Sequence, residues 1–222
     1  MIENITGENQ PELKSSPSWL KNILQKERAI IEKVSQQQKT EKSLPTDSNK
    51  DFITIWKKLD PNLQNEQSLI DTLAFLSRIS EQSLGMTPYE AQLLSALRLM
   101  KPNTLAEIKT GEGKTLITAL LAAIQSKKHS VHIMTANPYL AKRDAEEMAP
   151  FYSSLGISVA YLLNDPRKSK VCMQLNLEKN AFEEINRESV YQTGQIIYGT
   201  VSEFAFDHLR ATRNENPFSY DP

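Results

Sequence analysis

The sequence predicts an α/β fold, in which a parallel sheet with flanking helices is preceded by a helical amino-terminal extension. Two features of the chain support this prediction. Glycine is nearly absent before residue 85, where Gly7 is the one example among seven, and apolar residues recur there at helical spacing. From Leu105 onward, short apolar runs alternate with helical stretches, which is the pattern of β-α units in a parallel sheet. A chain of 222 residues is long enough for one mid-sized domain with such an extension.

Composition and charge exclude several classes of protein. Hydrophobic residues make up 39% and charged residues 24%, which is typical of a globular chain rather than a disordered one. The 26 basic side chains are balanced by 27 acidic ones, so there is no basic excess of the kind that favours a nucleic-acid-binding protein. The single cysteine, Cys172, excludes an internal disulfide and a cysteine-cluster zinc site, and we interpret it as a packing residue.

The sequence shows no targeting or membrane-spanning segment. Met1 to Ser16 has neither the basic start nor the apolar stretch of a signal peptide. The longest apolar run, Leu116 to Ile124, is far shorter than the roughly 20 residues of a membrane span. We therefore expect a cytoplasmic chain that meets a membrane only peripherally.

The amino-terminal extension is predicted to be one helix followed by a linker. Ser18 is a suitable N-cap, and the residues after it are apolar at helical spacing as far as Val34. Mixed charges favour a solvated helix packed by one face over a helix that docks on a partner or an anionic membrane. Gln36 to Lys50 has no apolar periodicity and contains Pro, Asp, Ser and Asn, so we predict an exposed linker there.

Helical periodicity resumes from Asp51 to Ser83, with a break at Pro61. We interpret the apolar stripes of this region as core packing. The predicted domain organisation is therefore a poorly ordered or helical extension with a linker over residues 1–50, followed by the main domain over residues 51–222.

Four strands and four helices are predicted after residue 100. Asn137 is the natural N-cap of the second helix, because Pro138 then takes the first helical position. The predicted strands are Thr104–Lys109, Val131–Thr135, Ile157–Leu163 and Gln195–Tyr198. The predicted helices run from Lys114 to about Ser126, from Pro138 to about Leu155, from about Cys172 to Glu188, and from near Ser202 onward.

A phosphate-binding loop is predicted between the first strand and the first of these helices. Its residues are Thr110, Gly111, Glu112, Gly113, Lys114 and Thr115. The two glycines let backbone N–H groups converge on an anion, and the amino end of the helix adds partial positive charge. In such a loop the lysine reaches the β- and γ-phosphates of a nucleotide, and the hydroxyl of the following residue ligates Mg²⁺. The general motif has Gly or Ala at the position of Ile108, and the alternative interpretation is a glycine-rich turn that binds nothing.

Four segments together resemble a known family. The loop segment Ala106–Thr115 reads AEIKTGEGKT, and Leu84–Leu94 upstream reads LGMTPYEAQLL. Downstream, Tyr139–Glu146 reads YLAKRDAE and Tyr198–Arg210 reads YGTVSEFAFDHLR. In order and spacing these segments resemble SecA, the ATP-driven motor of bacterial preprotein export, whose phosphate loop also lacks Gly or Ala at the position of Ile108. The resemblance covers about residues 84–213.

The resemblance implies the first nucleotide-binding domain of a translocation motor, a RecA-like P-loop domain that binds ATP with Mg²⁺. It places Thr110 to Thr115 on the phosphates, with Thr115 on Mg²⁺, and it places Gln92 on the adenine beside Met86 and Tyr89. Arg143 matches the motif arginine of the family, with a surface or packing role as the alternative. The implied partners are preproteins and a membrane translocon channel, without nucleic acid, and the implied location is the cytoplasm or the inner membrane face.

Several positions depart from the family pattern. Thr87 replaces the usual Arg, Pro138 replaces a polar residue, and Val201 and Ser202 replace paired asparagines, so we expect a divergent member. The sequence ends at Pro222, before the family's acidic motif and without the second motor half. Because phosphoryl transfer needs these parts together, we expect no complete catalytic set in this chain, weaker nucleotide binding than in a full motor and negligible hydrolysis by the chain alone.

Two other functions stay open at this point. A non-catalytic nucleotide-binding module or a truncated relic would keep the fold without turnover. A DEAD-type nucleic-acid helicase fragment shares the motor fold, but Ile108, the Tyr139–Glu146 segment and the balanced charge favour protein export over that function.

Other ionisable residues are given structural interpretations. Glu112, Asp144 and Glu146 could replace the missing Mg²⁺ carboxylates, but Glu112 matches the family's loop, and the other two belong to a charged helix face. The three histidines lack metal-binding spacing and are interpreted as structural: His129, His132 and His208.

Overall fold

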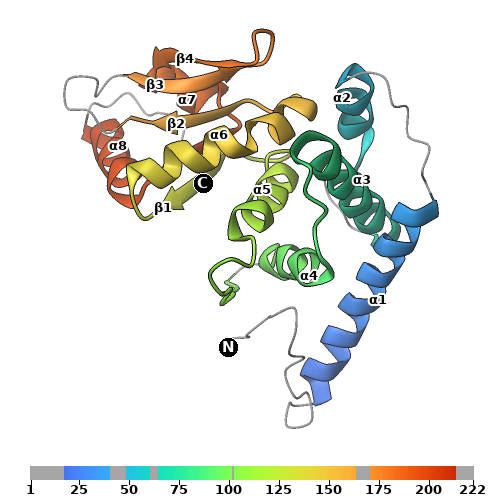
Figure 1. Ribbon diagram of the computed structural model, residues 1–222. Coiled ribbons are helices and arrows are strands. Elements are labelled where there is room, and N and C mark those ends of the chain that lie inside the picture. Colours follow the sequence, from blue (N-terminus) through green and yellow to red (C-terminus); the bar gives the residue numbers. More distant parts are fainter. Residues whose placement is uncertain (1–17, 41–48, 61–64, 102, 164–170, 214–222) are drawn as a thin grey trace. The chain divides into compact units, whose positions relative to one another are not determined.

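The computed structural model describes residues 18–40, 49–60, 65–101, 103–163 and 171–213 (Figure 1). The chain divides into two compact units, Met1–Leu121 and Ala122–Pro222, which are described separately below. The division falls inside helix α5 (Lys114–Gln125). No helix in the described part of the chain is both long enough and apolar enough to cross a bilayer.

The first unit is helical. Its elements are α1 (Ser18–Thr40), α2 (Asn49–Lys58), α3 (Glu66–Leu84), α4 (Glu90–Leu99) and the start of α5. Helix α3 forms the centre, because its residues from Ile70 to Ile79 are nearly all buried. Helix α1 packs on α3 and α4, and Trp56 of α2 stacks on Phe75 of α3 with ring centroids 6.3 Å apart. The apolar stripes read from the sequence are therefore core packing, as predicted.

The ends of α3 show why this segment is helical. Asn65 caps the amino end, and its side chain accepts a hydrogen bond from the Ser68 N–H at 2.6 Å. Gly85 caps the carboxyl end in the left-handed conformation, with φ of +68°, which glycine adopts without steric cost.

Two predictions for the first unit are wrong in part. Helix α1 continues through Gln36–Thr40, which was predicted to be linker, because Gln and Lys are good helix formers and Gln37 hydrogen-bonds Asp71 of α3 at 3.1 Å. Residues 41–48 of that linker and Pro61 lie outside the described residues, and the last two linker residues, Asn49 and Lys50, begin α2. The predicted strand Thr104–Lys109 is an extended segment with one isolated bridge at Glu107, since no continuous ladder of backbone hydrogen bonds forms along it.

The second unit is a five-stranded sheet with flanking helices. The strands are β1 (Val131–Thr135), β2 (Val159–Leu162), β3 (Val171–Asn176), β4 (Ala181–Asn186) and β5 (Ile196–Thr200), in the order β1-β5-β2-β3-β4. The first three in that order are parallel, whereas β3 and β4 are antiparallel. The predicted α/β class is confirmed, with a mixed sheet in place of a wholly parallel one.

Helices cover both faces of this sheet (Figure 1). Helix α6 (Pro138–Ser154) packs on β1, β5 and β2, where the Tyr152 and Tyr198 hydroxyls lie 2.9 Å apart in the core. Helices α7 (Arg187–Thr193) and α8 (Val201–Arg213) cover the opposite face. Their core is the apolar cluster of Ala160, Leu162, Cys172, Val190, Ile197 and Phe204.

Local signals explain the helix boundaries here. The Asn137 side chain accepts a hydrogen bond from the Leu140 N–H at 2.9 Å with Pro138 at the first position, so the predicted cap of α6 is confirmed. Thr200 and Glu203 form a reciprocal capping box at α8, since the Glu203 carboxylate accepts from the Thr200 N–H at 2.9 Å and the Glu203 N–H donates to the Thr200 hydroxyl at 3.3 Å.

The predicted helix from Cys172 to Glu188 is wrong. This segment forms the hairpin β3-β4 followed by α7. The Asn176 side chain accepts hydrogen bonds from the Glu178 and Lys179 N–H groups, and Asn180 has a φ of +50°, so asparagines build the turn. Cys172 and Leu175 are three residues apart, which imitates a helical period in the sequence.

Candidate nucleotide-binding site

The predicted phosphate loop is a tight turn that leads directly into α5. Gly111 has a φ of +89° and Gly113 a φ of +77°, values that side chains rarely adopt. At Gly113 a Cβ atom would lie 2.2 Å from Nε2 of Gln92, whereas at Gly111 it would meet nothing within 4 Å. Gly113 is therefore required both for backbone conformation and for close packing, and Gly111 for conformation alone.

The amino end of α5 follows this turn. The Ile117 N–H donates to the Gly113 carbonyl at 3.1 Å, which is the first hydrogen bond of the helix. The N–H groups before it have no carbonyl one turn earlier in the helix, and the first turn holds no acidic side chain. Such a helix terminus attracts an anion through its N–H groups and its dipole.

Gln92 connects the loop to helix α4. Its Oε1 accepts a hydrogen bond from the Tyr89 N–H at 2.9 Å, and its Nε2 donates to the Glu112 carbonyl at 3.0 Å. Gln92 is 8% exposed, so both bonds are largely shielded from water. The residue that the resemblance places on the adenine therefore also contacts the phosphate loop.

Lys114 and Thr115 are the first two residues of α5. The Lys114 ammonium donates to the Lys109 carbonyl at 2.8 Å, so the side chain folds back along the loop while the residue stays exposed. Thr115 is half-buried. The Glu112 N–H also donates to the Lys109 carbonyl, at 3.3 Å, and this bond closes the turn.

The segment before α4 presents two apolar side chains to solvent. Met86 is 39% and Tyr89 74% exposed. The backbone beside Met86 is fixed to α3, because the Ser80 hydroxyl donates to the Met86 carbonyl at 2.6 Å. Exposed flat or flexible apolar groups of this kind suit a planar ligand, and the Tyr89 backbone N–H also bonds the Gln92 amide.

Arg143, Asp144 and Glu146 belong to α6 in the second unit. Arg143 donates to Oδ1 of Asp144 at 2.6 and 2.9 Å, and this hydrogen bond raises the pKa of the guanidinium. Glu146 accepts from the Tyr161 hydroxyl at 3.1 Å and lies 3.9 Å from Lys142. These carboxylates thus have partners, in keeping with their interpretation as helix-face charges. The described residues contain no cluster of three His, Cys, Asp or Glu side chains that could hold a metal ion.

His132 and Cys172 are packed in the second unit. The His132 ring stacks on Phe204, with centroids 4.8 Å apart, and burial lowers the pKa of its imidazole. Burial raises the pKa of the Cys172 thiol to about 12, so the thiol stays protonated at neutral pH. Both geometries agree with a structural role.

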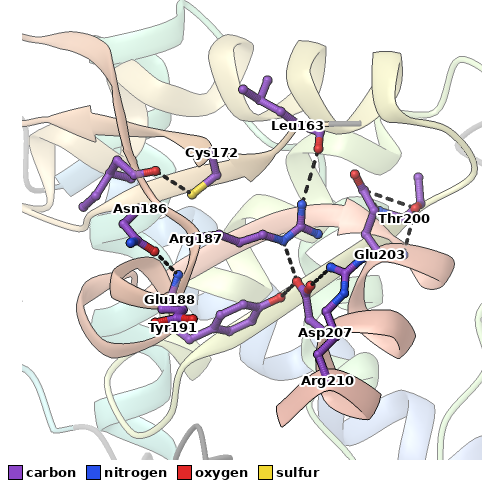
Figure 2. A network of polar contacts seen from close by, with 11 residues as sticks. Leu163, Cys172, Asn186, Arg187, Glu188, Tyr191, Thr200, Glu203, Asp207 and Arg210 are labelled. Carbon is purple, nitrogen blue, oxygen red and sulfur yellow. Dashed lines mark hydrogen bonds and ion pairs between the residues drawn. The ribbon is translucent and has the colours of Figure 1, made fainter. Parts of the chain in front are cut away.

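Sequence reasoning missed a polar network between α7 and α8 (Figure 2). Arg187 pairs with Asp207 at 2.7 Å and donates to the Leu163 carbonyl at 3.3 Å. Asp207 also accepts from the Tyr191 hydroxyl at 2.5 Å and from Arg210 at 3.1 Å. The sequence gives little indication of this network. The one sign is that Asp207 lies between Phe204 and Ala211 at helical spacing, on the buried face of α8.

The fold and the loop define a class of protein: an α/β domain that carries a phosphate-loop motif at the amino end of a helix. Within that class the chain belongs to the SecA DEAD-like domain family, which it matches over residues 14–217.

Relatives of known name agree with this assignment. The chain is 33% identical over 195 residues to the protein translocase subunit SecA of Wolbachia sp. subsp. Brugia malayi, covering 86% of this chain and 20% of that protein. It is 33% identical over 193 residues to the protein translocase subunit SecA 2 of Clostridioides difficile, covering 84% of this chain and 22% of that protein. The chain thus spans about a fifth of the length of these curated relatives.

Proposed function

We propose that this chain is the ATP-binding part of a SecA-like motor for protein translocation. The observation that carries the proposal is the loop geometry: two glycines at positive φ turn the backbone into the amino end of α5, where Lys114 and Thr115 follow at once. Membership of the SecA DEAD-like domain family supports the same function.

The phosphates of ATP bind at the turn in this proposal. Backbone N–H groups of Gly111 and of Gly113 to Thr115 donate to phosphate oxygens, while the Glu112 N–H keeps its bond to the Lys109 carbonyl. The Lys114 ammonium leaves that carbonyl to neutralise the β- and γ-phosphates. Mg²⁺ prefers oxygen ligands, and the half-buried Thr115 hydroxyl fits that preference. Bound Mg²⁺ would neutralise phosphate charge beside the loop.

The adenine binds beside α4 in this proposal. Beyond its bonds to Tyr89 and Glu112, the Gln92 amide keeps a second N–H and a second oxygen lone pair, which in this proposal meet the edge of the base. The exposed side chains of Met86 and Tyr89 offer apolar contact. Two further assignments stay predictions: Arg143 as the motif arginine, and residues 51–222 as a motor domain that follows an extension over residues 1–50.

The names of the relatives indicate which partners a motor containing this chain would have. Proteins named as translocase subunits match most of this chain, so we propose that preproteins and a membrane channel are the partners of the motor, without nucleic acid. With such partners, we propose that the chain lies in the cytoplasm or at the inner membrane face.

Titration calorimetry with ATP and Mg²⁺ tests the proposal on the wild-type chain and two variants. Lys114→Ala removes a charge-assisted contact of about 1.5–3 kcal/mol, so we expect affinity to fall about 10- to 100-fold. Lys109→Ala is the matched control, because it removes a neighbouring positive charge but keeps the carbonyl that Lys114 contacts. Equal affinity of wild type and Lys114→Ala would overturn the proposed phosphate site.

A further inference from the structure

Helix α1 carries a buried carboxylate, Glu27, on its packed face. Glu27 is 5% exposed and lies four and seven residues before Ile31 and Val34, which are 3% and 0% exposed. The three side chains therefore share one face of α1, which packs on α3 and α4. An ionised carboxylate in such a place is stable only if cations pair with it.

One partner of Glu27, Arg98, lies in the last turn of α4, and the other, Lys101, lies two residues after its end. Arg98 Nε lies 2.8 Å from Oε2, and Lys101 Nζ lies 2.7 Å from Oε1. The Arg98 side chain is 14% exposed, so its side of the cluster is shielded from solvent, whereas Lys101 is 52% exposed. One carboxylate thus fixes the carboxyl end of α4 to α1.

The amino end of the same helix contacts the phosphate loop. Gln92 accepts from the Tyr89 N–H and donates to the Glu112 carbonyl, and its amide fills the space where a side chain on Gly113 would lie. Helix α4 has ten residues, about 15 Å in length, and is buried from Gln92 to Leu97. A displacement of its carboxyl end therefore moves Gln92 at the other end.

We propose that Glu27 is a positioning residue for the phosphate loop: by holding Arg98 and Lys101, it keeps α4 in the position from which Gln92 supports the loop for nucleotide binding. This inference rests on the proposed function for its effect on ATP affinity. Its effect on the loop itself does not depend on ATP.

A second ion pair of α1 provides a matched control. Lys33 contacts Glu66 of α3 at 2.5 Å, and both side chains are more than half exposed. This pair joins α1 to α3, and it does not involve α4. Glu66→Gln therefore removes an exposed, and so weaker, ion pair of α1 without removing a contact of α4.

The test measures hydrogen exchange of the backbone amides of residues 109–116 and ATP affinity by calorimetry, in the full chain, for Glu27→Gln and Glu66→Gln. Circular dichroism first establishes a temperature at which all variants are folded. We expect Glu27→Gln to speed exchange in the loop and to weaken ATP binding about three- to tenfold. Glu66→Gln should change neither quantity.

Lys101→Ala keeps the measurement informative should Glu27→Gln not fold. It removes the exposed partner of Glu27, and we expect a smaller change in the same direction. Unchanged loop exchange and affinity in a folded Glu27→Gln, or equal changes in Glu66→Gln, would overturn the inference. If the wild-type chain fails to bind ATP, the proposed function fails, and the exchange comparison still decides whether Glu27 positions the loop.

Discussion

The phosphate loop of the first unit and the α7–α8 network of the second unit are both polar, but they are built in opposite ways. The loop depends on backbone conformation at Gly111 and Gly113, and its lysine is exposed. The network depends on side chains, and Asp207 at its centre is 4% exposed. An exposed loop of this kind is free to exchange partners with a ligand, whereas a buried network with all these bonds made holds two helices together.

The largest expected effect in this comparison comes from Asp207→Ala. It removes the acceptor of Arg187, Tyr191 and Arg210 at once and leaves the buried Arg187 without its carboxylate. Breaking a buried pair from one side costs about 3–5 kcal/mol, so we expect a loss of that size in the free energy of unfolding. Urea denaturation followed by circular dichroism measures it.

Arg210→Ala is the control for this substitution. The Arg210 side chain is 57% exposed, so its removal should cost no more than about 1 kcal/mol. Equal losses in the two variants would contradict the distinction between the buried and exposed parts of the network.

In the loop, the free energy of unfolding should be sensitive to substitution of the glycines, because these substitutions change the allowed backbone conformation. Gly113→Ala forces a side chain into the left-handed region and against Gln92, so we expect a loss of about 1–3 kcal/mol in the free energy of unfolding of the first unit. Gly111→Ala meets no neighbour and should cost only the backbone strain, about 1–2 kcal/mol. Tryptophan fluorescence during urea denaturation reports on this unit through Trp56, and a larger loss for Gly111→Ala would refute the role assigned to Gln92.

The glycine turn before α5 could be predicted from the sequence, because its residues are consecutive and glycine favours a particular backbone conformation. The amino-terminal cap of α6, Asn137, could be predicted for the same reason. The Arg187–Asp207 pair joins residues 20 apart on two helices, and nothing local marks such a pair. The strand predicted at Thr104–Lys109 shows the same limit, since a strand exists only where a neighbouring backbone supplies its hydrogen bonds.

The Tyr152–Tyr198 contact in the second unit is expected to contribute less than the Asp207 network. Tyr152→Phe leaves the Tyr198 hydroxyl buried without this partner, and we expect a loss of about 1–2 kcal/mol at neutral pH. A double-mutant cycle with Tyr198→Phe isolates the contact, and additive losses would show that the two hydroxyls do not interact.

The same contact predicts a dependence on alkaline pH. Burial raises the pKa of Tyr152 well above that of an exposed tyrosine, so the unfolded chain loses this proton first. The contribution of the protonated Tyr152 to the free energy of unfolding is therefore fully present below about pH 10 and decreases as the pH rises further. In Tyr152→Phe the free energy of unfolding should decrease less steeply over this pH range. Denaturation midpoints between neutral and alkaline pH measure the slope, and equal slopes in wild type and variant would rule out Tyr152 as its source.

The proposed functions of Lys114, Thr115 and Gln92 all depend on ATP binding at the loop between Lys109 and α5. Hydrogen exchange of the wild-type chain with and without ATP and Mg²⁺ tests it most directly, because each peptide of the chain is read separately. If ATP binds there, Gly111 to Leu116 and the segment around Gln92 should exchange more slowly in its presence. Unchanged exchange at these residues under saturating ATP, or protection confined to other parts of the chain, would contradict it.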